Sequence, residues 1–241
     1  VLDNISNGRI WLTAGMGYRP HEFEMFGKDI TKRLGLMNKA LDTLKKAWGG
    51  EPFEYDGRIV RVTPPGVQPG GPKIYMGGST EKSALRAAKG GYQYFPGHPG
   101  LWDIYAEERA KLGFPPPEPL VKSIASFLYI TDDPDRDWPR IAPHVAYATN
   151  TYAQWATERG TGDTLYKAAE TVEALKAMPN IKVLTPDQCF DWLKTQPANA
   201  GINFHALLGG LDPDLSWASL RLFEKAVLPR LIDAKMVDLN Q

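Results

Sequence analysis

Cysteine is almost absent from the 241-residue chain, which contains Cys189 alone. A single cysteine cannot form an internal disulfide or a thiolate metal site by itself, and it fits a reducing, cytoplasmic location. Net charge is absent too, because 28 Lys and Arg residues balance 28 Asp and Glu residues. No long-range electrostatic field therefore favours binding to nucleic acid or to an anionic membrane. Because no run of about 18 apolar residues and no charged-then-apolar leader occurs, we expect neither a membrane span nor a signal peptide.

Several catalytic signatures are missing as well. The 4 histidines stand apart from one another and from Cys or carboxylate partners at metal-ligand spacing, so we predict no metal site. No Gly-x-Ser-x-Gly motif marks the nucleophile of a hydrolase. The glycine-rich turn that begins at Gly15 has Pro20 where a dinucleotide-binding fingerprint needs its third glycine. These absences disfavour metalloenzymes, serine hydrolases and Rossmann dehydrogenases.

Short apolar strands alternate with amphipathic helices along the chain, a pattern typical of a parallel sheet with helical crossovers. The predicted strands cover residues 9–16, 73–78, 92–97, 120–131 and 201–209. The predicted helices cover 23–48, 80–89, 101–114 and 215–232, and residues 132–178 are mainly helical. The elements leave no room for further strands between them, whereas a closed α/β barrel needs eight.

Two segments fall outside this alternation. Asp56-Gly57 lies between two β-rich runs and predicts a tight hairpin near 53–62. Asp133-Pro134 predicts the start of a helix, and Pro143 is expected to kink or break it. We interpret 53–62 as a hairpin insertion and 134–178 as a helical insertion in a single domain that spans residues 1–241.

Candidate binding residues lie in the turns that follow the predicted strands, because barrel enzymes place their sites at the carboxyl ends of strands. After the first strand, Gly15-Met16-Gly17 would let a flat ligand approach the backbone, although the glycines also suit a plain tight turn. After the second strand, Gly77-Gly78-Ser79-Thr80 leads directly into a helix, whose amides and dipole suit a phosphate. Ser79 or Thr80 would equally serve as a simple N-cap.

The third strand end and the neighbouring loops supply further candidates. Tyr94 and Phe95 could flank a flat ring at the mouth of a barrel, or they could be ordinary core residues. Arg19, His21 and His98 lie in loops after strands and could face a substrate.

Taken together, these segments resemble the luciferase-like monooxygenase family, which includes bacterial luciferase and related FMN- or deazaflavin-dependent enzymes. The matching stretches are, in order, LDNISNGRIWLTAGMGY, EFEMFG with the following helix and its Arg33, ALDTLKKAWGGEPFEYDGR, PKIYMGGSTEKSALRAAKGG and SLRLFEKAVLPRL. The likeness is dense from Val1 to Gly97 and thin from Leu101 to Met178.

The resemblance implies an α/β fold of the (β/α)8 TIM barrel type that is N-terminally incomplete. The first three strand–helix units of the family would precede Val1, together with a strand-end histidine often implicated in the chemistry, so we name no catalytic residue here. The family also implies a homodimer.

For the cofactor, the resemblance implies FMN or a deazaflavin coenzyme at the barrel mouth. The phosphate would lie at Gly77-Gly78-Ser79-Thr80, the turn Gly15-Met16-Gly17 would face the flavin ring, and Tyr94 and Phe95 would lie near the neighbouring strand end. The run Tyr92-Gln93-Tyr94-Phe95 stands where many relatives carry Gly-Asp-Gly-Trp, so this contact is bulkier here.

We therefore expect a flavin-dependent monooxygenase that uses reduced FMN and oxygen on a small organic substrate, with the reduced flavin supplied by a separate reductase. A deazaflavin-dependent oxidoreductase of the same family is the first alternative. A flavin-binding protein without turnover is the second. A barrel enzyme acting on phosphorylated metabolites is the third, but the sequence shows no convincing set of catalytic Lys or carboxylate residues for it.

Overall fold

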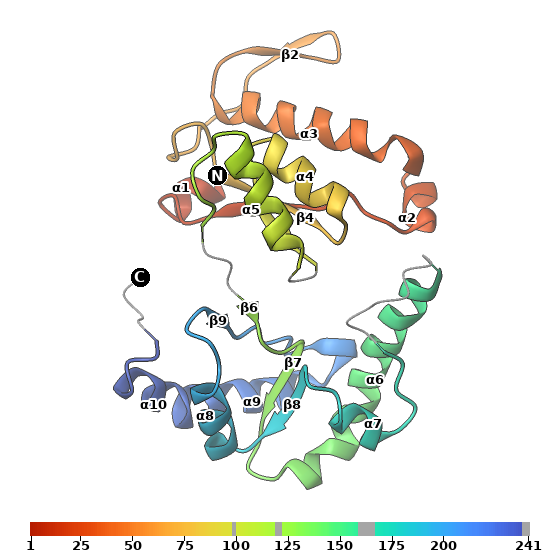
Figure 1. Cartoon of the computed structure of the whole chain (residues 1–241), viewed down its shortest axis with the longest axis vertical. Helices are drawn as coiled ribbons and strands as arrows, with labels where there is room; N and C mark the ends of the chain where they lie inside the picture. Colours follow the sequence, from red (N-terminus) through yellow and green to blue (C-terminus); the bar gives the residue numbers. More distant parts are fainter. Residues whose placement is uncertain (98–99, 119–121, 159–166, 238–241) are drawn as a thin grey trace. The chain divides into compact units, whose positions relative to one another are not determined.

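The computed structural model describes residues 1–97, 100–118, 122–158 and 167–237. These residues belong to two compact units, Val1–Pro119 and Leu120–Gln241. The first unit contains a three-stranded parallel sheet and a hairpin, and the second contains two pairs of parallel strands (Figure 1). No closed barrel is formed by the strands of the described segments.

The sheet of the first unit has the strand order β1 (Trp11–Ala14), β4 (Lys73–Gly78), β5 (Gln93–Pro96). All strands run parallel, and Met76 of β4 lies between Ala14 of β1 and Tyr94 of β5. Side chains of a strand alternate between the two faces of its sheet. One face is buried in the core of the unit, through Ala14, Ile74, Met76 and Tyr94.

Three helices cover this face: α3 (Arg33–Trp48), α4 (Glu81–Lys89) and α5 (Leu101–Lys111). Helix α4 presents only small side chains to the sheet, because Ala84, Ala87 and Ala88 are fully buried. A helix with such a face can approach the strands closely. The opposite face of the sheet carries the exposed side chains of Trp11 and Phe95.

The helix predicted over 23–48 is not continuous, because it is interrupted before Arg33. The structure has α2 (Pro20–Met25), a short 3-10 helix η1 (Ile30–Lys32) and only then α3. Gly27 adopts a left-handed backbone with φ of 61°, and the Asp29 side chain accepts a hydrogen bond from the Thr31 amide at 2.8 Å. These two local features end one helix and begin the next despite the continuous apolar stripe.

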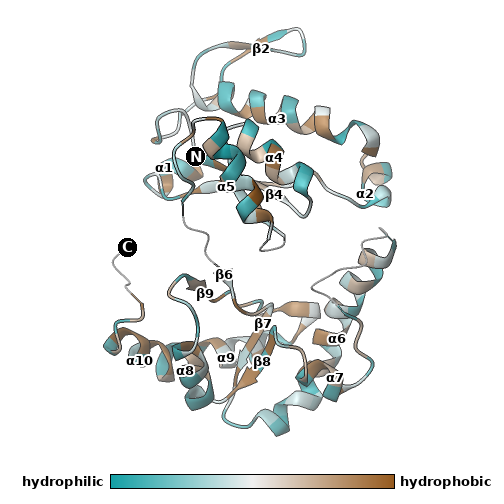
Figure 2. Ribbon diagram, in the orientation of Figure 1, coloured by the Kyte–Doolittle hydropathy of each residue, from teal (hydrophilic) through white to brown (hydrophobic). Residues whose placement is uncertain are grey.

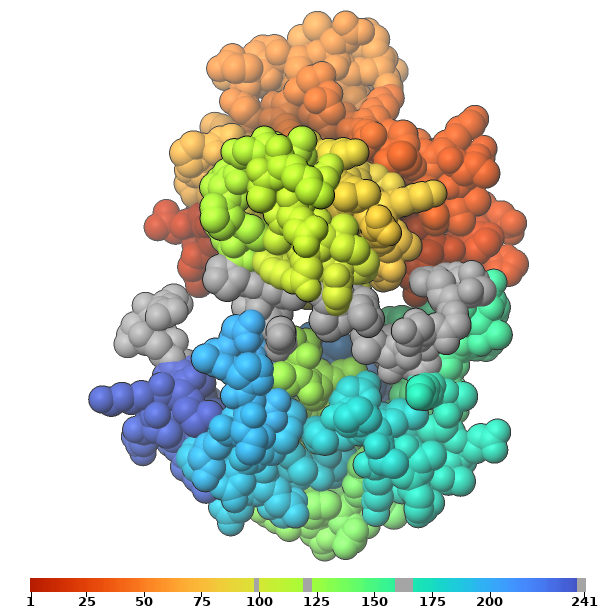
Figure 3. All heavy atoms as spheres, in the orientation of Figure 1, coloured from red at the N-terminus to blue at the C-terminus, as the bar shows by residue number. Residues whose placement is uncertain are grey.

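The hairpin at Asp56-Gly57 is confirmed. Strands β2 (Phe53–Tyr55) and β3 (Arg58–Val60) pair antiparallel, and both turn residues have positive φ, 48° and 75°, as a primed two-residue turn requires. Lys39 of α3 forms an ion pair of 2.6 Å with Asp56. The hairpin segment lies at the surface of the unit, in orange at the top of Figure 3. A short helix, α1 (Leu2–Ile5), begins the chain.

In the second unit, β7 (Phe127–Ile130) pairs with β8 (Ile181–Leu184), and β6 (Lys122–Ser123) pairs with β9 (Ala200–Gly201). Strand β7 is buried on both faces. Phe127 and Tyr129 pack against α6 (Pro134–Glu158) and α7 (Val172–Lys176). On the other face, Leu128 and Ile130 belong to a core that includes α8 (Pro186–Lys194), α9 (Pro213–Ala226) and α10 (Leu228–Asp233). Strand β8 is mostly brown, and so apolar, in Figure 2, and its Ile181 and Val183 are buried in the same core as Phe127 and Tyr129.

Four predictions for this unit were wrong. Strand β8 was missed, and the strand predicted over 120–131 is divided into β6 and β7. The strand predicted over 201–209 is reduced to β9: the chain turns at Ala206-Leu207, where the Leu208 amide donates to the His205 carbonyl at 3.0 Å, and then forms the 3-10 helix η2 (Leu208–Gly210). The helix predicted over 215–232 is divided at Val227, one residue before the start of α10.

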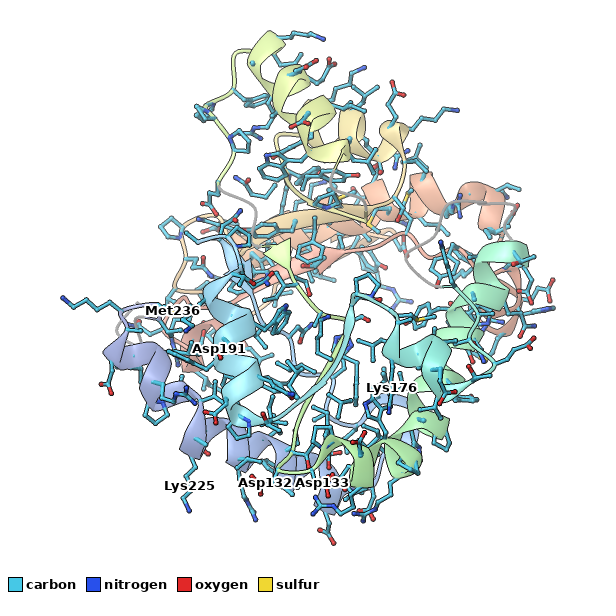
Figure 4. All side chains as sticks on the ribbon, turned by 60° about the horizontal axis from the view of Figure 1, so that its bottom comes forward. Asp132, Asp133, Lys176, Asp191, Lys225 and Met236 are labelled. Atoms are coloured by element: carbon cyan, nitrogen blue, oxygen red, sulfur yellow. The ribbon has the colours of Figure 1, made fainter. Side chains whose placement is uncertain are left out.

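Helix α6 continues through Pro139 and Pro143 without a break. Its start is fixed by a buried carboxylate, Asp137, which accepts two hydrogen bonds of 2.9 Å from Arg136 and one of 2.5 Å from Thr131. Figure 4 labels Asp132 and Asp133, where β7 passes into α6. Hydrogen bonding to Arg136 lowers the pKa of Asp137 to about 2. None of the helices in the described segments is long and apolar enough to cross a membrane.

Candidate cofactor site

The sheet of the first unit brings three of the predicted turns to one edge. Strands β1, β4 and β5 are parallel, so their carboxyl ends meet there. Gly77 lies beside Phe95, and Gly78 lies beside Pro96. Because Ala14 pairs with Met76, the turn that begins at Gly15 continues next to Gly77. Residues from three separate parts of the sequence thus form one continuous edge.

Two of the glycines at this edge are not required by packing within the described chain. A Cβ atom added to Gly15 would meet no described atom within 4 Å, and one added to Gly77 would lie 3.5 Å from the Ala14 carbonyl oxygen, an ordinary contact. Neither residue has a positive φ. Their missing side chains leave bare backbone that a flat molecule could approach closely.

Two other glycines have a structural reason. A Cβ atom on Gly78 would lie 2.3 Å from Cβ and Oγ of Ser83, so only glycine lets α4 begin this close to β4. Gly17 has a φ of 71°, and its carbonyl accepts a hydrogen bond of 3.1 Å from Arg33. Gly78 and Gly17 therefore determine the shape of the turns, whereas Gly15 and Gly77 leave open space beside the backbone of the strand ends.

Helix α4 begins directly at this edge. The Thr80 side chain accepts from the Ser83 amide at 3.2 Å, and the Ser83 hydroxyl accepts from the Thr80 amide at 3.1 Å, which makes a reciprocal capping box. The N-cap interpretation is therefore confirmed for Thr80. Ser79 lies just outside the helix, with its hydroxyl against Gly97. The first amides of a helix lack intrahelical backbone partners, which suits an anion. Here the capping box satisfies the Thr80 and Ser83 amides, so an anion would be held by the amides of Ser79, Glu81 and Lys82.

The two aromatic candidates lie on opposite faces of β5. Tyr94 is 1% exposed and packs on Tyr105 with ring centroids 5.3 Å apart, whereas Phe95 is 53% exposed on the open face. The Tyr94 hydroxyl donates to the Gly78 carbonyl at 2.8 Å and lies 2.9 Å from the Ser83 hydroxyl. Burial raises the pKa of Tyr94, which therefore stays neutral. Phe95 can meet a ligand on the open face, and Tyr94 contacts the turn from the core.

Two arginines contact the first turn. Besides the bond from Arg33 to Gly17, a guanidinium nitrogen of Arg86 lies 3.5 Å from the Met16 sulfur. Sequence reasoning did not identify Arg86. Its position on the last turn of α4 gives no local signal, and only the packing of α4 beside β1 brings it to Met16. Both side chains add positive charge near the edge where an anion would be held.

The substrate candidates receive less support from the geometry. His21 is 82% exposed and lies 3.4 Å from Glu24 on its own helix. Arg19 is half-buried at the start of α2. His98 lies outside the described residues. Among the residues with described positions, no three His, Cys, Asp or Glu side chains gather in a way that could hold a metal ion.

Comparison with known families gives this edge a context. The sequence model of the luciferase-like monooxygenases matches residues 1–203. The chain belongs to the luciferase-like monooxygenase family. Among proteins compared by sequence, an uncharacterized protein y4vJ of Sinorhizobium fredii (strain NBRC 101917 / NGR234) is 29% identical over 99 residues, a match that covers 39% of this chain and 28% of that protein. The matched part therefore spans well under half the length of that relative.

Solved structures of this luciferase-like type share the fold. Monooxygenase RslO1 from Streptomyces bottropensis has a TM-score of 0.65 at 20% identity, with 95% of this chain and 71% of that chain covered. The oxygenating constituent of 3,6-diketocamphane monooxygenase from Pseudomonas putida, in complex with FMN, has a TM-score of 0.60 at 18% identity, with 95% and 73% covered. A coenzyme F420-dependent tetrahydromethanopterin reductase from Methanopyrus kandleri has a TM-score of 0.52 at 16% identity, with 95% and 76% covered.

Proposed function

We propose that the edge formed by β1, β4 and β5 binds FMN and that the chain acts as a luciferase-like flavin-dependent monooxygenase on a small organic substrate. The observation that carries the proposal is the position of Gly15 and Gly77. Both leave open backbone that packing does not require, beside the start of α4. Family membership supplies the reason to expect a flavin there.

Each residue group has a distinct part in this proposal. The turn from Gly77 to Thr80 and the start of α4 hold the phosphate with backbone amides, and Arg86 adds positive charge nearby. Gly15 and Gly77 let the ring system approach the strands, and Phe95 packs against it from the open face. When bound, reduced FMN would supply the electrons with which oxygen is activated for insertion into the substrate.

The cofactor could also be a deazaflavin, since a structure of the same fold is that of an F420-dependent reductase. We favour FMN, because a structure of the same fold at a higher TM-score was solved in complex with FMN. The remaining parts of the proposal are reduced flavin from a separate reductase, a homodimer and a cytoplasmic location.

A titration of the chain with FMN and with the deazaflavin coenzyme, followed by flavin fluorescence, tests the proposal. We expect saturable binding of FMN, and faster oxygen consumption by reduced FMN when a substrate is present. Preferred binding of the deazaflavin would select the first alternative. Binding without turnover would indicate a flavin-binding protein, and no binding of either cofactor would refute the site.

A further inference from the structure

The Tyr94 hydroxyl lies behind the proposed phosphate turn, residues 77–80, and contacts Gly78 and Ser83. The hydroxyl donates to the Gly78 carbonyl oxygen at 2.8 Å, and this carbonyl oxygen also accepts a hydrogen bond of 2.8 Å from the Gly97 amide. The Tyr94 hydroxyl also lies 2.9 Å from the Ser83 hydroxyl, which in turn donates to the Thr80 carbonyl at 2.5 Å. Both side chains are more than nine-tenths buried, with exposures of 1% for Tyr94 and 6% for Ser83.

The direction of the Gly78 carbonyl fixes the direction of the next amide. In a planar trans peptide, the C=O of one residue and the N–H of the following residue point in opposite directions. Because the Gly78 carbonyl points toward Tyr94 in the core, the Ser79 amide points away from the core. The Gly97 amide and the Tyr94 hydroxyl thus hold the same carbonyl, and together they fix a peptide that follows two adjacent, conformationally permissive glycines.

We propose that Tyr94 and Ser83 are positioning residues that orient the turn of residues 78–80 for the phosphate of the bound flavin. The inference rests on the proposed function. The Tyr94 hydroxyl reaches the turn from the core of the unit, behind the surface that would face a ligand. Neither residue touches the ligand.

Flavins with and without a phosphate separate this role from a general structural one. Dissociation constants for FMN and riboflavin are measured by flavin fluorescence with the whole 241-residue chain and with Tyr94→Phe. Loss of one hydrogen bond predicts FMN binding about fivefold weaker in the variant. Riboflavin has no phosphate, so its dissociation constant is expected to change by less than about twofold, within the usual scatter of small effects.

Tyr105→Phe is the matched control. Tyr105 packs against Tyr94 in the same core, but its hydroxyl donates to the Tyr92 carbonyl at 2.8 Å, away from the turn. It should leave the ratio of the two dissociation constants unchanged. Ser83→Ala should lower the preference for FMN, and the double variant Ser83→Ala/Tyr94→Phe should lose less than the sum of the single losses, because both act through one turn.

The possible outcomes separate a failure of the phosphate site from a failure of the positioning role of Tyr94. A wild-type chain that binds FMN no more tightly than riboflavin would refute the phosphate site, and this inference with it. A wild-type preference for FMN that Tyr94→Phe leaves intact would refute this inference alone. Equal weakening of FMN and riboflavin in Tyr94→Phe would also overturn it, since the tyrosine would then support the fold without acting on the phosphate.

Discussion

Replacing each of the two neighbouring glycines of β4 by alanine should separate binding from folding. In Gly77→Ala, the new Cβ would lie 3.5 Å from the Ala14 carbonyl oxygen and 3.9 Å from Thr13 Cγ2, so the strand accepts it without movement. We expect the free energy of unfolding to change by no more than about 0.5 kcal/mol. In Gly78→Ala, the new Cβ would lie 2.3 Å from Ser83. The overlap forces α4 to shift, and it should cost about 1–3 kcal/mol.

The effect on FMN should follow from the face on which each methyl group lies. The methyl group of Gly77→Ala projects onto the open face, where the proposed ring system contacts the backbone. We expect its dissociation constant for FMN to rise at least about tenfold, which corresponds to 1.4 kcal/mol. Gly78→Ala should weaken binding as well, but as a consequence of the displaced turn.

Urea unfolding followed by circular dichroism gives the free energies of unfolding, and FMN fluorescence gives the dissociation constants. Gly15→Ala is the companion to Gly77→Ala, because its Cβ would meet no described atom within 4 Å. The reasoning is refuted if Gly77→Ala destabilises the chain as much as Gly78→Ala does. It is equally refuted if Gly77→Ala binds FMN as tightly as the wild type.

Three further predictions concern stability and reactivity. In the folded chain the pKa of Asp137 is about 2, below its ordinary 3.8, so the ionised side chain contributes about 2 kcal/mol to the free energy of unfolding above pH 4, and this contribution is lost between about pH 4 and pH 2. Urea unfolding of Asp137→Asn should lack this acid dependence. A variant with the same pH profile as the wild type would contradict the assignment. Leu41 is 2% exposed and is the one buried residue of α3. Leu41→Ala should lower the free energy of unfolding by about 2–5 kcal/mol, measured by urea unfolding. A decrease under about 1 kcal/mol would contradict the packing of α3 on the core of the unit. Burial raises the pKa of Cys189 to about 12, so a thiol reagent should modify it only after unfolding, and rapid labelling of the native chain at pH 8 would contradict the buried position.

The elements with strong local signals were predictable from the sequence. Strand β4 occupies the predicted residues 73–78, and α4 follows at Thr80 as its capping residues indicated. Strand β8 was missed because its four residues, Ile181–Leu184, include Lys182 and are too few to show a period. The strand expected over 201–209 failed for a different reason, because the chain turns at Ala206-Leu207 and then forms η2.

The structure brings the turns after β1, β4 and β5 to one edge of the sheet, as parallel strands predict, but the contacts of each residue there were not predictable from the sequence. Gly15, Gly77 and Gly78 look alike in the sequence, and only the distance from each to its neighbours shows which glycine serves packing. The contact of Arg86 with Met16 spans 70 residues. No local pattern encodes a contact of this kind, because it depends on how α4 packs beside β1.

Side-chain alternation along a strand, combined with the strand register, assigns several of these residues to a face of the sheet. Side chains alternate along a strand, so Gly77 and Gly78 must face opposite sides of the sheet, and so must Tyr94 and Phe95. The apolar Ile74 and Met76 mark the covered face, which assigns Gly78 to the helices and Gly77 to the open side. In β5, the pairing of Met76 with Tyr94 places Tyr94 on the covered face and Phe95 on the open one. Tyr94 and Phe95 therefore face opposite sides of the sheet and cannot flank one ring together: Tyr94 supports the Gly78 carbonyl from the core, and Phe95 is the one of the two that lies on the open face.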